Sequence, residues 1–265
     1  MHSVIFRQLI IIVITLSYFS ISEAKTYALV ADGLIDGKAN NVLQDKAVIV
    51  TGNQITAIIN IDHIPKDAVK IELPGTTLMP GMINAHEHPL LYKSDYQNAH
   101  LQASSAYKAL LGLKNLQRLL RAGWTTIRVM GDGDVYYANQ DIRKVIDSGV
   151  FIGPRLTGAA HYISITGGGG DINYFSPEQT VIADGLIADG PDEIRKAIRK
   201  EIKYGSDWIK IMVTGAFMSV GDNPRNVSFS PQELAAAVEE ASRHNIPVAA
   251  HAHATEGINQ AIIAG

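Results

Sequence analysis

The sequence predicts an α/β protein that has a short all-β region at residues 25–80 and a parallel-stranded region at residues 81–265. In the second region five apolar, β-rich segments alternate with five segments of helical periodicity, and this alternation implies a parallel sheet. In the first region no helical period occurs, and Gly and Pro separate short β-rich runs. The composition of the 265 residues, 46% hydrophobic and 18% charged, is ordinary for a globular protein.

The first region contains the pattern of a β-hairpin. Residues 47–50 and 55–59 are apolar runs, and Thr51-Gly52-Asn53-Gln54 between them is a turn sequence. Residues 69–73 alternate apolar and charged side chains, which is typical of a half-buried strand. We therefore expect short strands here and no helix.

The second region is expected to begin with a strand and to alternate from there. Apolar runs predict strands at 78–85, 124–130, 155–165, 207–213 and 246–250. Helical spacing predicts helices at 101–121, 138–148 and 191–204, after Ser230, and at 255–264. Pro191 suits a first helical turn, and Ser230-Pro231-Gln232-Glu233 is a capping box.

Two architectures fit this alternation, an open doubly wound sheet and a (β/α)8 barrel of the TIM type. Five β–α units cannot close a barrel of eight. The sequence therefore predicts either an open sheet or an incomplete barrel whose C-terminal units lie beyond Gly265.

Composition excludes several classes of protein and of site. Lys and Arg number 23 against 26 Asp and Glu, for a net charge of −3, so a nucleic-acid partner is not expected. The chain has no Cys, which excludes disulfides, a Cys nucleophile and a Cys-ligated zinc site. A metal ion would have to be held by His, carboxylate or a modified side chain.

Residues 1–24 have the pattern of a signal peptide. Arg7 precedes an apolar run at 9–19, and Ser22-Glu23-Ala24 places small residues at both specificity positions of a cleavage site. The run is shorter than the ~20 residues of a spanning helix. We expect cleavage before Lys25, a periplasmic or secreted protein and no membrane contact after cleavage; an uncleaved anchor is the alternative.

Two His-x-His pairs follow predicted strands. Residues i and i+2 of a strand share a face, so His86 and His88 can point at one metal ion from the strand end. His251 follows the strand at 246–250, and His253, in the loop, is a candidate for contact with substrate or for support of the site. Neutral imidazole suits zinc. For each pair the alternative is a surface or hydrogen-bonded histidine without a metal.

Lys210 lies inside the apolar strand at 207–213. A charged amine is costly to bury there, so it should pair with a carboxylate, lose its proton or be chemically converted. A neutral lysine amine can add carbon dioxide to form a carbamate, an anion whose two oxygens can bridge two cations. The alternative is a lysine whose amine reaches out of the strand end to solvent.

In combination and in this order, three segments resemble the amidohydrolase superfamily: residues 78–88, 208–212 and 248–253. Gly153-Pro154-Arg155 and the Thr-Gly-Gly stretch that begins at Thr166 are similar to its Xaa-Pro dipeptidase (prolidase) branch. The resemblance implies a distorted (β/α)8 barrel at 81–265 and a small β-sandwich that includes residues 25–80. It also implies two divalent metal ions, zinc-like, with His86 and His88 on one, His251 on the other and carboxylated Lys210 between them.

Members of the family add a His after the sixth strand and an Asp, the general base, after the eighth. Neither position lies within residues 1–265, so the general-base Asp is absent from this chain. This branch usually has His where Gly169 stands, which leaves the substrate contact of that loop open.

These observations predict a hydrolase of amide bonds in small peptides, Xaa-Pro or related dipeptides, that uses a metal-bound hydroxide at a binuclear site. One alternative is a mononuclear deaminase or cyclic-amide hydrolase of the same superfamily, similar to imidazolonepropionase. Another is an inactive, truncated fragment. The substrate is the one partner expected, and homo-oligomerisation stays open.

Overall fold

The structure is a computed structural model that describes residues 24–265, and the chain divides into two compact units at Pro80–Gly81. The predicted signal segment, except for Ala24, lies outside the described residues. In the part described, no helix combines the length and the hydropathy needed to cross a bilayer.

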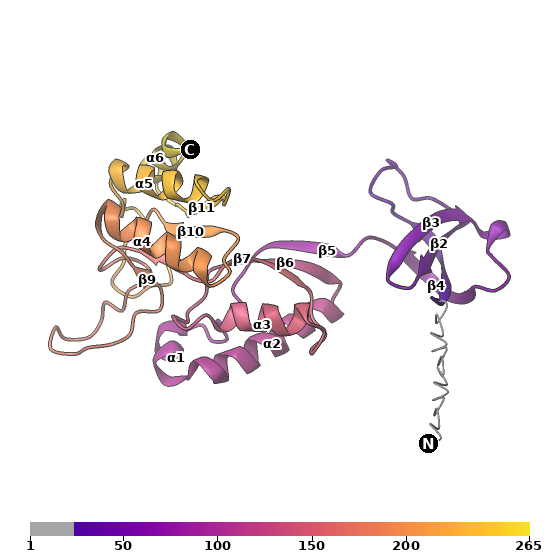
Figure 1. Cartoon of the computed structure of the whole chain (residues 1–265), viewed down its shortest axis with the longest axis horizontal. Helices are drawn as coiled ribbons and strands as arrows, with labels where there is room; N and C mark the ends of the chain where they lie inside the picture. The colour runs from indigo at the N-terminus through magenta and orange to yellow at the C-terminus, as the bar shows by residue number, and fades with distance from the viewer. Residues whose placement is uncertain (1–23) are drawn as a thin grey trace, which may run out of the picture. The chain divides into compact units, whose positions relative to one another are not determined.

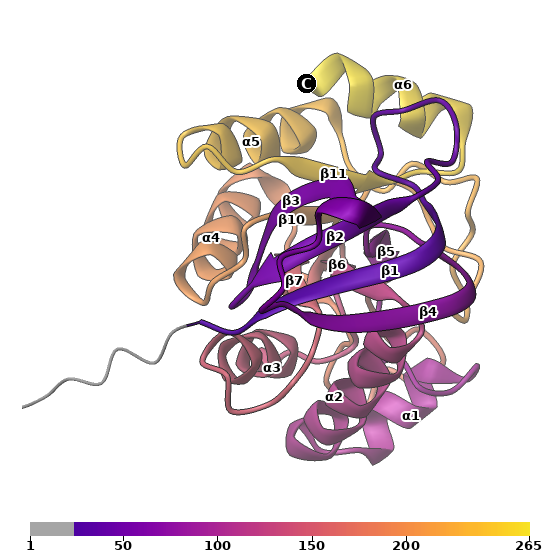
Figure 2. The same ribbon diagram turned by 90° about the vertical axis from the view of Figure 1, so that its right-hand side faces the viewer.

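The N-terminal unit is a four-stranded sheet of mixed direction with the order β3-β2-β1-β4, labelled in Figure 2. Its strands are β1 (Thr26–Leu34), β2 (Lys46–Thr51), β3 (Gln54–Asn60) and β4 (Val69–Leu78), with a short 3-10 turn, η1, at Ile61–His63. β2 and β3 form the predicted antiparallel hairpin, whose turn needs Gly52 because its φ is +61°. β4 pairs with β1 in parallel.

Small and branched side chains from one face of this sheet form a separate core. Ala28, Ala47 and Ile49 are buried there, and apolar residues of β3 and η1 pack against them. Residues 24–80 contribute one sheet layer, so the second layer of the expected sandwich is not among them. The sandwich stays a prediction.

The second unit alternates parallel strands with helices (Figure 1). Its strands are β5 (Met82–Glu87), β6 (Trp124–Met130), β7 (Arg155–Ala159), β8 (Tyr162–Ser164), β9 (Leu186–Ile187), β10 (Ile209–Met212) and β11 (Val248–His251). Its helices are α1 (Tyr96–Gln102), α2 (Ser105–Arg121), α3 (Ala138–Asp147), α4 (Gly190–Lys203), α5 (Pro231–Ser242) and α6 (Thr255–Ala264).

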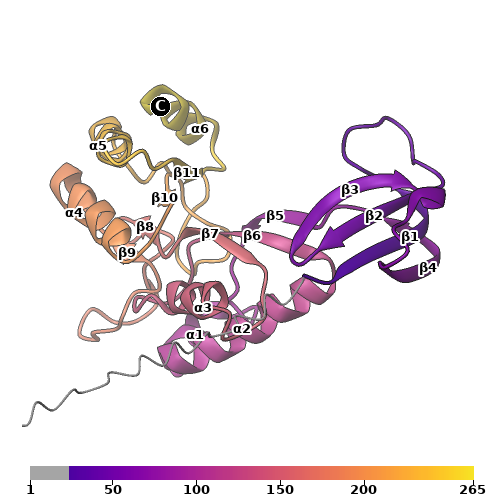
Figure 3. The same cartoon turned by 45° about the vertical axis from the view of Figure 1, so that its right-hand side comes forward.

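The strands form two parallel sheets, β5-β6-β7 and β11-β10-β8-β9. Helices α4, α5 and α6 lie in succession along one side of the second sheet, and α2 and α3 lie side by side against the first (Figures 1 and 3). The larger core lies under α4 and α5, where Ile194 and Ile198 of α4 meet Ile209 and Ile211 of β10. The α/β class is therefore confirmed. Residues 81–265 form no closed barrel, and the incomplete barrel stays a prediction.

Three expected elements are divided in the structure. The strand expected at 78–85 is the end of β4 and the start of β5, separated by residues 79–81, because Pro80 cannot donate to a sheet. The helix expected at 101–121 is two helices, since the Ser104 hydroxyl accepts from the Tyr107 amide and starts α2 anew. The strand expected at 155–165 breaks after β7, where the chain leaves one sheet and enters the other.

Candidate active site

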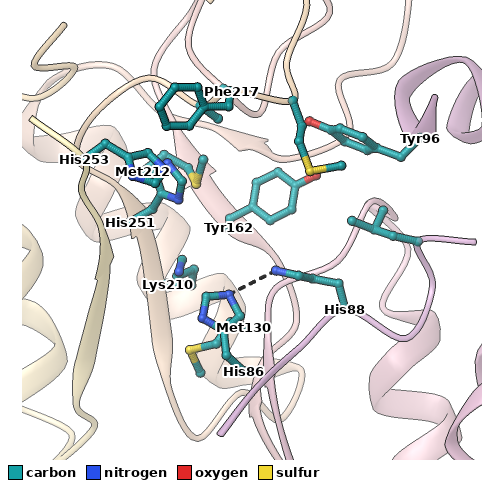
Figure 4. Close-up of a pocket in the computed structure, with 14 residues that line it drawn as sticks. His86, His88, Tyr96, Met130, Tyr162, Lys210, Met212, Phe217, His251 and His253 are labelled. Carbon is teal, nitrogen blue, oxygen red and sulfur yellow. Dashed lines mark hydrogen bonds between the residues drawn. The ribbon is translucent and has the colours of Figure 1, made fainter. Parts of the chain in front are cut away.

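One cavity of about 280 Å³ collects every candidate site residue of the sequence: His86, His88, Lys210, His251 and His253 all line it (Figure 4). They come from the carboxyl ends of β5, β10 and β11 and from the loop after β11. In parallel α/β folds, ligands bind at this end of the strands. Their positions agree with the expectation, while their roles as metal ligands stay a prediction.

The alternation of β10 explains how Lys210 reaches the cavity. Ile209 and Ile211 are buried in the core under the helices, whereas Lys210 and Met212 line the cavity on the other face. The sheet register places Tyr162 of β8 beside Lys210 and His251 of β11 beside Met212. Residues paired in register on neighbouring strands point to the same face of the sheet. Side chains of β8, β10 and β11 therefore converge on the cavity.

His86 and His88 face each other across a short distance. Their Nε2 atoms are 3.1 Å apart, and the Nδ1 of His88 lies 2.6 Å from the Gly131 carbonyl oxygen. That contact requires a proton on Nδ1 of His88, which leaves a lone pair on its Nε2. Two nitrogens bound to one tetrahedral zinc ion at 2.0–2.1 Å stand about 3.4 Å apart, so the pair is close to the spacing of two ligands of one ion.

Three imidazoles of this site, those of His86, His88 and His251, have a lowered pKa, which favours their neutral form. Burial, and then the positive charge of Lys210, lower the pKa of His86 to about 4 and that of His251 to about 4. Burial also lowers the pKa of His88. Neutral rings carry a free lone pair for a cation and would release no proton on binding it.

His251 and His253 pack edge to face, with ring centroids 4.5 Å apart. The Nε2 of His251 lies 3.2 Å from the Gly215 carbonyl oxygen, so its proton sits on Nε2 and its Nδ1 is free. The ring of His253 lies between His251 and the ring of Phe217, with centroids 4.7 Å apart in the second pair. His253 therefore packs against both His251 and Phe217 and lines the cavity, while its role as a substrate contact or as support stays a prediction.

Lys210 is buried, with 4% of its surface exposed, and faces the cavity between the two histidine groups (Figure 4). Burial, and then the nearby charge of Arg128, lower the pKa of its amine to about 8. No carboxylate of the described residues contributes to this pKa, so the outcome in which Lys210 pairs with Asp or Glu is wrong. The amine also does not reach solvent along the strand end.

The side chains of the cavity offer few of the ligands that the metal ions implied by the resemblance would need. Among residues 24–265 no group of three His, Cys, Asp or Glu side chains is close enough to hold an ion. The cavity nevertheless brings together three neutral imidazoles and one unpaired amine, and no Asp or Glu lines it. These residues fit divalent ions once an anionic ligand is added, and a carboxylated Lys210 as that ligand stays a prediction.

Several lining residues were not predicted from the sequence. Tyr96 of α1, Tyr162 of β8, and Phe217 and Met218 of the loop after β10 all face the cavity. The apolar pair Phe217-Met218, in the segment directly after the lysine strand, was a signal that could have indicated these two residues, whereas nothing in the sequence indicated Tyr96 or Tyr162.

His161, which lies between β7 and β8, does not line the cavity. It is fully buried, with its Nδ1 2.6 Å from Oε1 of Glu201 on α4 and its ring packed edge to face on Tyr137. The break between β7 and β8 turns it toward the helices. His161 is therefore a structural residue.

Known proteins share this sequence and this arrangement. Residues 77–265 match the Amidohydrolase family. Ochratoxinase from Aspergillus niger is 31% identical over 266 aligned residues, which cover 93% of this chain and 54% of that protein. This chain thus spans about half the length of the curated relatives it matches.

Solved structures agree. A Xaa-Pro dipeptidase with methionine bound in its active site is 30% identical, with a TM-score of 0.81, over 91% of this chain and 60% of the other. The crystal structure of A. niger ochratoxinase is 31% identical, with a TM-score of 0.78, over 92% and 59%. Because the family match covers most of the residues and includes every strand that lines the cavity, the resemblance seen in the motifs is confirmed and the chain belongs to the amidohydrolase family.

Proposed function

We propose that this chain forms a metal-binding active site that hydrolyses amide bonds in small peptides or acyl amino acids. The observation that carries the proposal is the buried, unpaired amine of Lys210 between His86 and His88 on one side and His251 on the other. Relatives with activities named for an ochratoxin and for Xaa-Pro dipeptides support amide hydrolysis. Members of this family generally use divalent metal ions.

Lys210 is proposed to carry a carbamate. With its pKa at about 8, roughly a tenth of the amine is unprotonated at pH 7. The unprotonated amine nitrogen forms a bond to the carbon of carbon dioxide and releases one proton. Together with the proton that the ammonium group loses beforehand, two protons leave, and a carbamate anion replaces the cation. This change supplies the negative charge that the three imidazoles lack and removes the cost of a buried ammonium.

Two divalent ions, which we propose to be zinc, would lower the pKa of a water to about 7 and polarise the amide carbonyl. His86 and His88 would hold one ion through their Nε2 atoms, His251 the other through Nδ1, and the Lys210 carbamate would contact both. The Gly131 carbonyl keeps His88 in the tautomer that this role needs. Among residues 24–265 no carboxylate faces the cavity to accept a proton from the water.

Metal content and turnover test the proposal together. The protein is loaded with zinc in the presence of ¹³C-bicarbonate, the bound metal is counted by mass spectrometry, and a carbamate signal is sought by NMR. Hydrolysis is then measured on a panel of Xaa-Pro dipeptides and N-acyl amino acids. We expect two ions per chain, a carbamate carbon signal and release of the free amino acid.

Two variants sharpen this test. Lys210→Met should remove the carbamate signal, the bridged ions and turnover, whereas Lys203→Met, at an exposed lysine of α4, should change none of them. A single bound ion with full turnover would favour the mononuclear alternative. Two ions and full turnover in Lys210→Met would show that the bridging role is wrong.

A further inference from the structure

Much of the cavity wall is apolar. Six of its lining side chains are aliphatic, thioether or aromatic hydrocarbon: Leu91, Met130, Met212, Ala216, Phe217 and Met218. The single amine on the wall, Lys210, belongs to the proposed metal site, and no Arg, Asp or Glu of residues 24–265 lines the cavity. A charged group placed against this wall would lose its water without gaining a partner.

Two of these side chains combine high exposure with a position on the cavity wall. Phe217 is 75% exposed and Met218 is 62% exposed, although both lie on the cavity wall. Adjacent large apolar side chains presented to solvent at a cleft are typical of a binding surface. Figure 4 shows Phe217 above His253 and Met212, at the edge of the space that the histidines enclose.

The loop that carries them, residues 214–227, is held in place. Thr214 and Val227 form an antiparallel bridge at its base, and the Ala216 amide donates to Oδ2 of Asp222 at 2.7 Å. These contacts close the loop on itself. Phe217 and Met218 are therefore presented by a restrained backbone.

Helix α1 and the glycine-rich stretch hold the far side of the same loop. The Ser219 hydroxyl donates to the Gly169 carbonyl oxygen at 2.6 Å and accepts from the Tyr96 hydroxyl at 2.8 Å. The Val220 amide donates to Oε1 of Gln97 at 3.3 Å. Ser219 and Gln97 are both buried, so these bonds are shielded from water.

Gly169 makes room for this arrangement. A Cβ at residue 169 would lie 3.0 Å from Oδ2 of Asp222, 3.0 Å from Cε of Met212 and 3.2 Å from Cβ of Ala216. The missing side chain lets the loop and Met212 close the apolar wall next to the histidines.

We infer that the 214–227 loop and Met212 form a specificity subsite for an uncharged, apolar side chain or ring attached beside the scissile amide. The inference rests on the proposed function, since it places the amide at the histidines and its apolar substituent on Phe217 and Met218. An aromatic ring would stack on Phe217 and contact the thioether of Met218. An acidic or basic substituent is disfavoured.

Binding and turnover are measured separately. Calorimetric titration of the zinc-loaded protein with N-acetyl-L-phenylalaninamide is compared with titration with N-acetyl-L-lysinamide, and hydrolysis rates are measured on N-acetyl amino acids and Xaa-Pro dipeptides with apolar or charged Xaa. We expect the phenylalanine probe to bind at least about tenfold more tightly than the lysine probe. Phe217→Ser should weaken its binding about tenfold, and Met218→Ser should weaken it less.

The control is Phe151→Ser, because Phe151 is an exposed phenylalanine that does not line this cavity. It should leave binding unchanged. Equal binding of the two probes would overturn the subsite. Unchanged binding of the phenylalanine probe in both loop variants would overturn it as well. Both results would also be expected if another protein, and not the substrate, covered this surface. Apolar binding that Phe217→Ser weakens, without hydrolysis of any amide, would support the subsite and contradict the proposed function.

Discussion

The buried amine of Lys210 makes a prediction about stability that is independent of turnover. A pKa of about 8 in place of the usual 10.5 means that folding costs roughly 3 kcal/mol more with the amine protonated than with it neutral. Lys210→Met replaces the amine with an apolar side chain of similar length in a position that is 4% exposed. We therefore expect the metal-free variant to be about 2–3 kcal/mol more stable than the wild-type chain at pH 7.

The pH dependence follows from the sign of the shift. Below pH 8 the amine is protonated in both the folded and the unfolded chain, so the full penalty applies. Between pH 8 and 10.5 the unfolded chain binds more protons than the folded chain, and stability rises with pH. Above pH 10.5 the penalty is gone. The advantage of Lys210→Met should therefore shrink across this window.

Urea unfolding of the metal-free proteins, followed by circular dichroism at pH 7 and pH 10, measures this difference. Other groups that titrate in the window are common to both chains, so only the difference between them is interpreted. Lys203→Met, at an exposed lysine, should change stability by no more than about 0.5 kcal/mol. A Lys210→Met chain that is less stable than wild type at pH 7, or whose advantage is the same at both pH values, would refute the reasoning.

Three further outcomes are expected. Glu201→Gln should destabilise the chain by about 2–4 kcal/mol, because the buried carboxylate accepts from both the amide and Nδ1 of His161. Burial by itself raises the pKa of Glu201, but the hydrogen bond and charge of His161 lower it below 4.5. The stability of the wild-type chain should therefore fall as the pH drops below 4.5. In acid unfolding, Glu201→Gln should lose less stability than the wild type over the same pH range. Gly169→Ala should lower the free energy of unfolding in urea by about 1–3 kcal/mol, because the added Cβ crowds Asp222. It should also weaken the binding of N-acetyl-L-phenylalaninamide measured by calorimetry. Unchanged binding would mean that the cavity wall accommodates the added methyl group. Ser230→Ala should cost about 1 kcal/mol in the same unfolding assay, since it removes the capping box of α5, and a neutral effect would show that the cap adds nothing there.

Local patterns determined much of this protein. The strand at 124–130 matches β6, the helix at 255–264 matches α6, and the capping box starts α5 where its residues indicate. In each case the signal is a periodicity or a cap that acts within one turn or one strand. The alternation of side chains along a strand also predicted that His86 and His88 share a face and that Lys210 points away from its apolar neighbours. The reason is that successive side chains of a strand point to opposite faces of the sheet.

Only the tertiary structure decided what surrounds those residues. The break between β7 and β8 turned His161 away to Glu201, since the chain changes sheets there and the strand pattern does not show it. Phe217 and Met218 reach the cavity because the 214–227 loop is pinned by partners about 50 and 120 residues away in the chain, Gly169 and Tyr96. Contacts between residues so distant in the chain carry no local period, and they set which substituents the wall can accept.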